Sequence, residues 1–433
     1  MIRVLEYIVN FIVDKIILWP FYYPITLLMK EVKVGGSSKS NGITILALNV
    51  DRFRGELEIL SQAGFKVFKM PYEWQTRVFY AYKDRDKKLE FKSPLVNSLI
   101  YTDRIRLRKY LSELLKKIIL KKDIDCVITA NIFYNQDFDW SAVASKLGLP
   151  YIAFHRENLV VNDHMYSVNI EYAKLLKEIG FHGSSIVFHN KIMKSVYDKY
   201  SGVNQSAIHA LGSLRMDQYI HNIKSNKNKI NNSRITLFSF PSTTAIEGIH
   251  RNNFSWHRLH DSVHASFIEL AIENPEIEFV IKHKGVGWME TKTLLIGLNA
   301  FDIVNLKIHG ELSDAQELIL ESDVVTGFCS TALLEAGISG KPIVYPLFEE
   351  AHDKRYSDFL CFSDALNMFD IATSKDEYKE LLIKKMNNPV ILETVMKFRE
   401  LQFERHVSSL NADTLKKYSE LIIREVENSA PII

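Results

Sequence analysis

Two hydroxyl residues, Ser330 and Thr331, stand where a buried strand is expected to turn into a helix. The apolar run 323–326 predicts a parallel strand, and Gly327 gives the following turn its backbone freedom. The first turn of a helix offers free N–H groups and the positive end of its dipole to an anion, and the two hydroxyls add donors. Glu335 follows Thr331 by four residues and is therefore expected on the same helical face, within reach of a ribose hydroxyl. The spacing fits an ordinary strand–helix unit with Ser330 as N-cap equally well.

Cations and hydroxyls also follow two other predicted strands. Lys282, His283 and Lys284 end the strand expected over 277–282, beside a glycine that admits close approach, and their chemistry suits a phosphate or pyrophosphate. Ser242 and Thr243 follow the strand expected over 234–240 and predict either a phosphate or sugar contact or a capping turn.

The acid–base candidates follow an earlier strand, expected over 150–154. His155, Arg156 and Glu157 come directly after it, and Glu157 is the first choice for a general base. A salt-bridged loop is the alternative. Asp163 is a second candidate for the same role.

Two further groups carry weaker signals. Arg215 and Asp217 follow Gly212 and predict either a backbone nest with a charged clamp near an interdomain hinge or a structural ion pair. Glu349 and Glu350 follow the strand expected over 342–346 and can hold sugar hydroxyls. Without a second carboxylate cluster we expect no metal site and no metal cofactor.

The elements that position these residues form two successive strand–helix series. The first series predicts strands over 42–49, 65–70, 125–131, 150–154, 186–189 and 207–212, with helices over 56–63, 99–122 and 140–147. The second predicts strands over 234–240, 277–282, 305–309, 323–326 and 342–346, with helices over 259–273, 289–298, 314–321, 377–386 and 391–427. The pattern predicts two parallel-sheet α/β domains, 42–221 and 234–390, joined by a Lys/Asn/Ser-rich linker at 222–233 and followed by terminal helices over 391–433. Parallel sheets bind ligands at the carboxyl ends of their strands, where the candidate residues lie. No GxGxxG follows the first strand, so a dinucleotide fingerprint is absent from the sequence.

Composition sets limits on partners and compartment. With 54 basic and 52 acidic residues the net charge is +2, which argues against a nucleic-acid partner. The three cysteines (Cys126, Cys329 and Cys361) are far apart in sequence, which predicts free thiols in a reducing compartment and argues against structural zinc.

The amino-terminal segment, 1–32, has an apolar stripe at helical spacing, with Pro20 and Pro24 expected to break the helix. Its longest uncharged run, 16–29, is too short to span a bilayer, which needs roughly 20 residues. We expect it to lie in the plane of a membrane through Trp19 and its aromatic neighbours. Packing against protein is the alternative. A polar linker is expected at 33–41.

Three of these stretches carry a family resemblance. Segment 323–346 resembles the carboxy-terminal nucleotide-binding signature of GT-B glycosyltransferases, and Lys282-His283-Lys284 is similar to the strand exit, often His-Pro, of capsule and lipopolysaccharide transferases of that fold. Segment 212–217 is similar to the Gly-x-Pro-Arg-x-Asp segment of CDP-glycerol glycerophosphotransferase-like enzymes. The sequence departs from these patterns at Leu214 and Lys284, each of which replaces a proline.

The resemblance implies two Rossmann-like domains, with the nucleotide bound mainly by the second, the acceptor mainly by the first, and the terminal helices crossing back to the first. It implies a metal-independent glycosyltransferase of surface-polysaccharide assembly, peripherally attached to the inner face of the cytoplasmic membrane, which takes a nucleotide-sugar donor and a glycan or lipid-linked glycan acceptor. CMP-linked acidic sugars, UDP-sugars and CDP-alditols all remain open as donors, as do inversion and retention. A nucleotide-sugar 2-epimerase and a non-catalytic scaffold are the alternatives.

Overall fold

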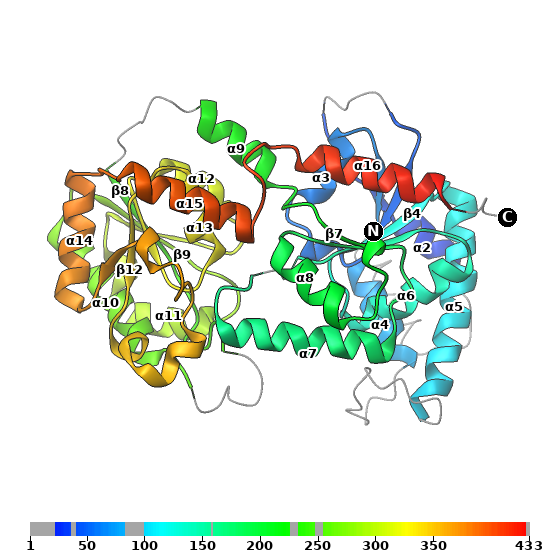
Figure 1. Cartoon of the computed structure of the whole chain (residues 1–433), viewed down its shortest axis with the longest axis horizontal. Coiled ribbons are helices and arrows are strands. Elements are labelled where there is room, and N and C mark those ends of the chain that lie inside the picture. The colour runs from blue at the N-terminus through cyan, green and yellow to red at the C-terminus, as the bar shows by residue number, and fades with distance from the viewer. Residues whose placement is uncertain are drawn as a thin grey trace. The chain divides into compact units, whose positions relative to one another are not determined.

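The computed structural model describes residues 22–35, 40–82, 99–156, 159–225, 233–246 and 254–429, which form two compact α/β units (Figure 1). Of these residues, the first unit takes those up to 156, 170–217 and 411–429, and the second takes 159–169 and 218–410. The chain therefore passes between the units four times. The last change of unit, at residue 411, returns the end of the chain to the first unit.

The first unit is built on a seven-stranded sheet of order β1-β3-β2-β4-β5-β6-β7. Only β1 runs antiparallel to its neighbour, and the other neighbouring strands pair in parallel. The strands are β1 (Lys30–Glu31), β2 (Thr44–Ala47), β3 (Lys66–Lys69), β4 (Cys126–Thr129), β5 (Tyr151–Phe154), β6 (Ser185–Phe188) and β7 (Ile208–Ala210). Because β3 lies on one side of β2 and β4 on the other, the order reverses between β2 and β4.

The second unit is built on a six-stranded parallel sheet of order β10-β9-β8-β11-β12-β13. Its strands are β8 (Arg234–Phe238), β9 (Glu278–Lys282), β10 (Leu306–His309), β11 (Val324–Gly327), β12 (Ile343–Pro346) and β13 (Asp370–Ala372). The order reverses between β8 and β11. Ligands of open parallel sheets bind at such a reversal, beyond the carboxyl ends of the strands.

Helices connect the strands in both units. Those up to residue 225 are α2 (Tyr22–Leu28), α3 (Glu56–Gln62), α4 (Tyr72–Tyr82), α5 (Leu99–Lys122), α6 (Asn135–Lys146), α7 (Asp163–Ile179), α8 (Lys191–Tyr200) and α9 (Met216–Ser225). The later ones are α10 (His257–Glu273), α11 (Trp288–Gly297), α12 (Ala315–Glu321), α13 (Thr331–Ile338), α14 (Lys375–Asn387), α15 (Glu393–His406) and α16 (Thr414–Glu427). The single helix expected over 391–427 is wrong, because the chain leaves helical geometry between His406 and Thr414. The linker expected at 222–233 is helical up to Ser225.

The described end of the amino-terminal segment packs on protein. Ile25 and Met29 are buried, and α2 contacts α5. Pro24 does not break this helix, because it lies in the first turn, where its missing N–H costs no hydrogen bond. The predicted membrane-contacting residues up to Phe21 lie outside the described residues. In the part of the chain that the structure describes, no helix is both long and apolar enough to cross a membrane.

The last helix completes the core of the first unit. Tyr418, Leu421 and Ile422 of α16 are buried in one apolar cluster with residues of β2 and α3, such as Ile45. Asp217 fixes the start of this helix, because its carboxylate accepts from the backbone N–H of Thr414 (3.2 Å) and Leu415 (2.8 Å). Asp217 therefore serves as a helix cap, a role that was not among the two expected for it, the hinge clamp and the structural ion pair.

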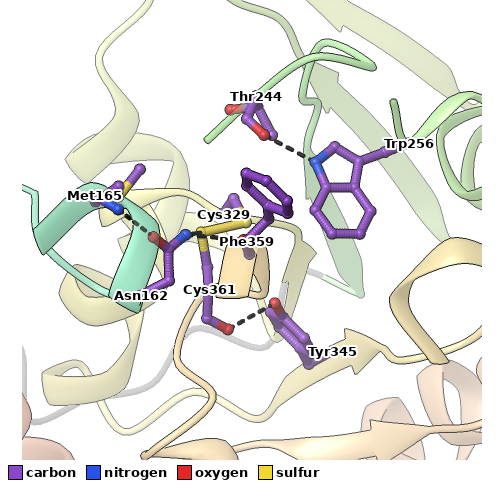
Figure 2. The surroundings of a disulfide bond; sticks show 8 residues. All are labelled: Asn162, Met165, Thr244, Trp256, Cys329, Tyr345, Phe359 and Cys361. Carbon is purple, nitrogen blue, oxygen red and sulfur yellow. Dashed lines mark hydrogen bonds between the residues drawn. A yellow bond between two sulfur atoms is a disulfide. The ribbon is translucent and has the colours of Figure 1, made fainter. Parts of the chain in front are cut away.

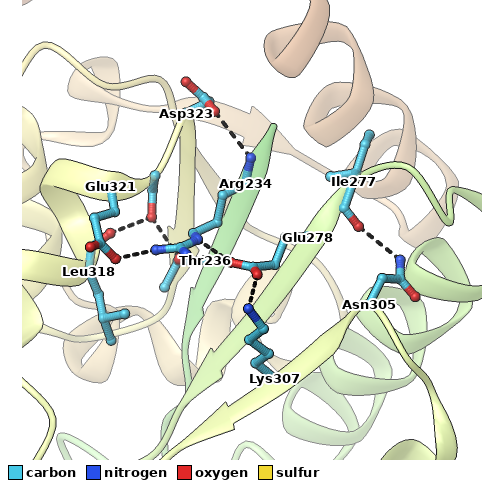
Figure 3. A network of polar contacts seen from close by, with 10 residues as sticks. Arg234, Thr236, Ile277, Glu278, Asn305, Lys307, Leu318, Glu321 and Asp323 are labelled. Carbon is cyan, nitrogen blue, oxygen red and sulfur yellow. Dashed lines mark hydrogen bonds and ion pairs between the residues drawn. The ribbon is translucent and has the colours of Figure 1, made fainter. Parts of the chain in front are cut away.

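An ion-pair network joins the amino ends of the strands in the second unit (Figure 3). Arg234, the first residue of β8, donates to Glu278 of β9 and to Glu321 of α12, and its backbone N–H donates to Asp323 (3.1 Å). Lys307 of β10 pairs with the same Glu278. The network therefore ties three neighbouring strands together at their amino ends, which lie opposite to the carboxyl ends where the candidate residues are found.

Candidate functional site

The loops that follow β8, β9 and β11 pack against one another. Gly327 ends β11 opposite Phe238, and a Cβ atom at Gly327 would lie 2.9 Å from the Phe238 carbonyl oxygen, so this close approach of the strands needs glycine. The Phe328 ring lies 5.2 Å from Phe240 in the loop after β8. Gly287, in the loop after β9, packs against Pro241 in the same way. Three strand exits therefore meet at the reversal of the second sheet.

The predicted junction at Ser330 and Thr331 is a helix start. Ser330 is the N-cap of α13, and its hydroxyl oxygen accepts from the Ala332 N–H (3.3 Å). Thr331 is exposed in the first turn, whereas Ser330 is buried. The Thr331 hydroxyl is therefore the more accessible donor at this end of the helix dipole.

Glu335 lies on the buried side of α13. Its side chain is 5% exposed, and its backbone carbonyl accepts from the Tyr219 hydroxyl (2.9 Å). Burial raises the pKa of Tyr219, and the Glu335 carboxylate raises it further. Glu335 is thus buried beside the Tyr219 phenol of α9, whereas Thr331, at the start of the same helix, is exposed.

The cationic loop after β9 begins inside the sheet and ends in solvent. Lys282 is buried and its carbonyl accepts from the Ser239 N–H (3.0 Å), whereas Lys284 is exposed. The His283 ring stacks on Trp288, with ring centroids 3.6 Å apart, and its Nδ1 lies 3.1 Å from the Lys284 carbonyl. The stacking holds the His283 imidazole in a fixed orientation beside this loop.

Ser242 and Thr243 follow β8 in a tight turn. The backbone N–H of Ser242 lies 3.4 Å from a Glu290 carboxylate oxygen of α11, and the Ser242 carbonyl accepts from the Trp256 N–H (2.6 Å). The pKa of Glu290 is lowered overall. Burial acts to raise this pKa, but the contacts of the carboxylate, first of all the hydrogen bond with the Ser242 hydroxyl, together outweigh burial. Ser242 is therefore engaged inside the unit, which favours the capping-turn interpretation for that residue. Thr243 is partly exposed.

Two buried histidines under this loop were not singled out by the sequence. His260 and His264 of α10 are both fully buried, with ring centroids 4.3 Å apart. His264 Nδ1 donates to the His260 carbonyl (2.7 Å), so its Nε2 accepts from the Ser239 hydroxyl (2.9 Å). Burial lowers the pKa of His264 to about 3, and neighbouring His260 lowers it as well. The neutral ring therefore anchors the residue that follows β8. The spacing of four on an apolar helix face was the signal in the sequence.

Cys329 and Cys361 form a disulfide, so the expectation of free thiols is wrong for this pair (Figure 2). Their Cα atoms lie 5.2 Å apart although 32 residues separate them in sequence. Asn162 donates to the Phe359 carbonyl (2.8 Å), and the Tyr345 hydroxyl donates to the Cys361 carbonyl (3.0 Å). The disulfide therefore fixes the residue before Ser330 to a well-anchored loop.

One of the carboxylates after β12 is also committed to structure. Glu350 lies in the helical turn η5 (Glu349–His352), and its two oxygens accept from the backbone N–H groups of Arg258 (3.0 Å) and Leu259 (2.8 Å) at the start of α10. It therefore caps α10, and the expected role in holding sugar hydroxyls does not suit it.

The acid–base candidates are divided between the units. His155 follows β5 in the first unit and is 3% exposed, with the Ile132 N–H 3.4 Å from its Nδ1. Asp163 is exposed at the start of α7 in the second unit. Glu157 lies outside the described residues.

A second buried polar group, at the reversal of the first sheet, was also missed by the sequence. Asp137 in the first turn of α6 accepts from Thr129, Asn49 and Gln75. Burial raises its pKa to about 7, although these three hydrogen bonds oppose the rise. No sequence motif marks Asp137, because its partners come from three separate segments.

No protein-family model and no protein of curated function matches the sequence. Solved structures do match. A putative UDP-N-acetylglucosamine 2-epimerase from Listeria monocytogenes aligns over 91% of this chain and 99% of its own, with a TM-score of 0.51 and 11% identity. Another UDP-N-acetylglucosamine 2-epimerase aligns over 91% of this chain and 98% of its own, with a TM-score of 0.50 and 9% identity. The fold is GT-B. At such identities the likeness shows the fold alone.

A glycosyltransferase from Rickettsia africae aligns over 90% of this chain and 100% of its own at 13% identity, but its TM-score of 0.44 is too low to carry an argument. The GT-B fold confirms the expected pair of parallel-sheet domains. The predicted donor-binding residues Lys282 and His283 lie at the carboxyl end of β9, and Ser330 and Thr331 lie just after β11. These strand exits meet at the sheet reversal, where open parallel sheets bind ligands.

Proposed function

We propose that this protein is a glycosyltransferase that moves a sugar from a nucleotide-sugar onto an acceptor glycan. The observation that carries the proposal is the meeting of three strand exits at the β8/β11 reversal, with cations on one loop and a helix start on another. The donor phosphates bind there, at the amino end of α13 and beside the loop 282–284. The surface-polysaccharide acceptor and the membrane attachment belong to this proposal.

The same groups supply the chemistry. As the glycosidic bond to the nucleotide breaks, negative charge grows on the leaving phosphate. The exposed Thr331 hydroxyl, the dipole of α13 and the Lys284 ammonium stabilise that charge without a metal ion. If the reaction inverts the anomeric centre, Glu157 or Asp163 takes the acceptor proton. CMP, UDP and CDP donors are all compatible with this chemistry.

The first test is nucleotide binding. Melting temperatures are measured with CMP, CDP, UDP, GDP and ADP at millimolar concentration, because a ligand of the folded state raises the melting temperature according to its affinity. We expect one base to give the largest rise. No rise with any nucleotide would contradict the proposal and favour a scaffold.

Two single variants locate the site. Thr331→Ala and Lys284→Gln should each weaken the selected nucleotide by about 1.5–3 kcal/mol, the usual loss for a hydrogen bond to a charged group. The matched control is Thr293→Ala, an exposed threonine on α11 whose hydroxyl donates to its own helix (2.8 Å). Equal affinity in wild type and both site variants would remove these residues from the site.

The second test separates the transferase from an epimerase. The protein is incubated with UDP-N-acetylglucosamine alone, and the sugar products are resolved by chromatography. We expect no 2-epimer. Steady epimer formation without an acceptor would replace the proposal by nucleotide-sugar 2-epimerisation.

A further inference from the structure

Three arginines gather at the carboxyl edge of the first sheet. Arg156 follows β5, Arg215 follows β7, and Arg54 lies in the loop between β2 and α3. These strands run in parallel within one sheet, so their exits share one edge. Glu56, at the start of α3, is the carboxylate that pairs with the side chains of Arg156 and Arg215.

Glu56 engages all three segments. Its Oε1 lies 2.9 Å from Arg156 Nε and 3.7 Å from Arg215 Nε, and its Oε2 accepts from the backbone N–H of Arg54. The Glu56 side chain is 7% exposed, whereas those of Arg156 and Arg215 are 19% and 28% exposed. The two guanidinium groups therefore reach further toward solvent than the carboxylate between them.

The cluster has more donors than acceptors. Within the described ranges, Nε of Arg156 and Nε of Arg215 are buried donors without a well-aligned hydrogen-bond acceptor. The guanidinium groups of Arg156 and Arg215 share the one carboxylate of Glu56, which leaves an excess of one positive charge in this pair of contacts. An ion pair needed only to hold Glu56 would use one arginine.

The electrostatic effect is visible on neighbouring groups. Burial lowers the pKa of Arg156, Glu56 opposes this, and Arg215 and Arg54 lower it further. Burial lowers the pKa of His189, which follows β6, to about 3, and Arg156 and Arg215 lower it as well. The positive charge at this edge therefore belongs to the arginines and not to His189.

We propose that Arg156 and Arg215 bind an oxyanion on the acceptor, either the carboxylate of an acidic sugar or a phosphate of a phosphorylated glycan. This inference rests on the proposed transferase function and names its acceptor class. The guanidinium group presents paired donors that match both kinds of oxyanion, and a bound oxyanion supplies acceptors to the Nε–H groups. Glu56 holds the arginines in place when the acceptor is absent.

The test measures binding of three sugars by titration calorimetry on the full chain. Glucuronate carries a carboxylate, glucose 1-phosphate carries a phosphate, and glucose is the neutral control. We expect one of the two anions to bind and glucose not to bind. The better anion tells which kind of oxyanion the acceptor carries, and no binding of either would overturn the proposal.

Variants assign the binding to the cluster. Arg156→Gln and Arg215→Gln should each weaken the bound anion at least tenfold, and Arg156→Lys should lie between Gln and wild type because it keeps the charge but loses the paired donors. Arg106→Gln is the control, since Arg106 is an exposed cation on α5 of the same unit. Unchanged anion affinity in both glutamine variants would refute the assignment. Circular dichroism checks folding, and Arg215, the more exposed of the two, gives the result if Arg156→Gln does not fold.

Nucleotide binding separates this inference from the proposed function. If the nucleotide raises the melting temperature of wild type and Arg156→Gln equally while anion binding is lost, both stand. If Arg156→Gln also weakens the nucleotide, the arginines belong to the donor site and the acceptor assignment fails. If no nucleotide binds but the anion does, the transferase proposal fails and the anion site remains.

Discussion

His264 gives a pH-dependent stability that can be worked out from its surroundings. Its ring is fully buried and neutral, with Nδ1 donating to a carbonyl and Nε2 accepting from Ser239. Its pKa is about 3 in the folded protein, whereas an unfolded histidine titrates near pH 6.5. Below pH 6.5 the histidine is therefore protonated in the unfolded chain but stays neutral in the folded protein. The free energy of unfolding falls as the pH falls.

The size of this loss follows from linkage. The slope approaches about 1.4 kcal/mol per pH unit below the unfolded pKa, and because the unfolded ring is already half protonated at pH 6.5, His264 alone should cost about 2 kcal/mol on going from pH 6.5 to pH 4.5. The His264→Asn variant keeps a donor for the carbonyl but has no ring to protonate. Its baseline stability will be lower, yet its loss between pH 6.5 and pH 4.5 should be smaller than that of wild type by about this amount.

Urea unfolding at a series of pH values measures this difference. His189 and His406, whose pKa values are about 3 and about 4, also steepen the wild-type curve, so only the difference between variants isolates His264. An exposed histidine, His352→Asn, is the control and should follow wild type. Parallel curves for wild type and His264→Asn would refute the reasoning.

Four other changes give distinct outcomes in urea unfolding. Glu350→Ala removes the cap of α10 and should cost about 2–4 kcal/mol, with Glu350→Gln recovering part of the loss. Arg234→Met removes the ion-pair network at the amino ends of the strands in the second sheet and should lower the free energy of unfolding by about 1–3 kcal/mol. Nucleotide affinity should stay unchanged, since the proposed site lies at the carboxyl ends of the strands. Gly327→Ala places a Cβ 2.9 Å from a carbonyl oxygen of β8 and should cost about 1–3 kcal/mol. Cys361→Ser opens a disulfide that spans 32 residues and should cost about 3–4 kcal/mol by chain entropy.

A different outcome would contradict each of these four predictions. A nucleotide affinity that falls with Arg234→Met would mean that the two edges of the sheet are coupled. A reductant should lower the stability of wild type toward that of Cys361→Ser and leave the variant unchanged. If the reductant has no effect on wild type, the disulfide does not form in solution. Variants of Glu350 or Gly327 within 0.5 kcal/mol of wild type, a difference of roughly the size seen for ordinary surface substitutions, would contradict the assigned contacts.

Local signals in the sequence predicted most strands and the start of α13. The strand runs are apolar and short, and Ser330 directly precedes an apolar helical face, so periodicity and capping chemistry were sufficient there. They also predicted α5 over its full length. Pro24 was misread because a proline in a first turn and a proline that breaks a helix look alike without the helix start.

Contacts between distant segments were beyond those signals. The disulfide partners are 32 residues apart, and nothing in their spacing indicates that they meet. Asp217 caps a helix almost 200 positions later, so its role depends on the tertiary fold. The donors that surround Asp137 come from β4, α4 and the turn after β2, and only the assembled sheet brings them to one carboxylate.

The packing of α16 into the first unit has a consequence for how the chain folds during synthesis. Tyr418, Leu421 and Ile422 share one apolar cluster with Ile45, so this core lacks part of its lining until residues near 422 have left the ribosome. The second sheet, over 234–372, is synthesised before that point and does not depend on α16 for its strands. The domain that is translated first is therefore the one that is completed last, and its nascent form exposes apolar surface while the intervening residues are made.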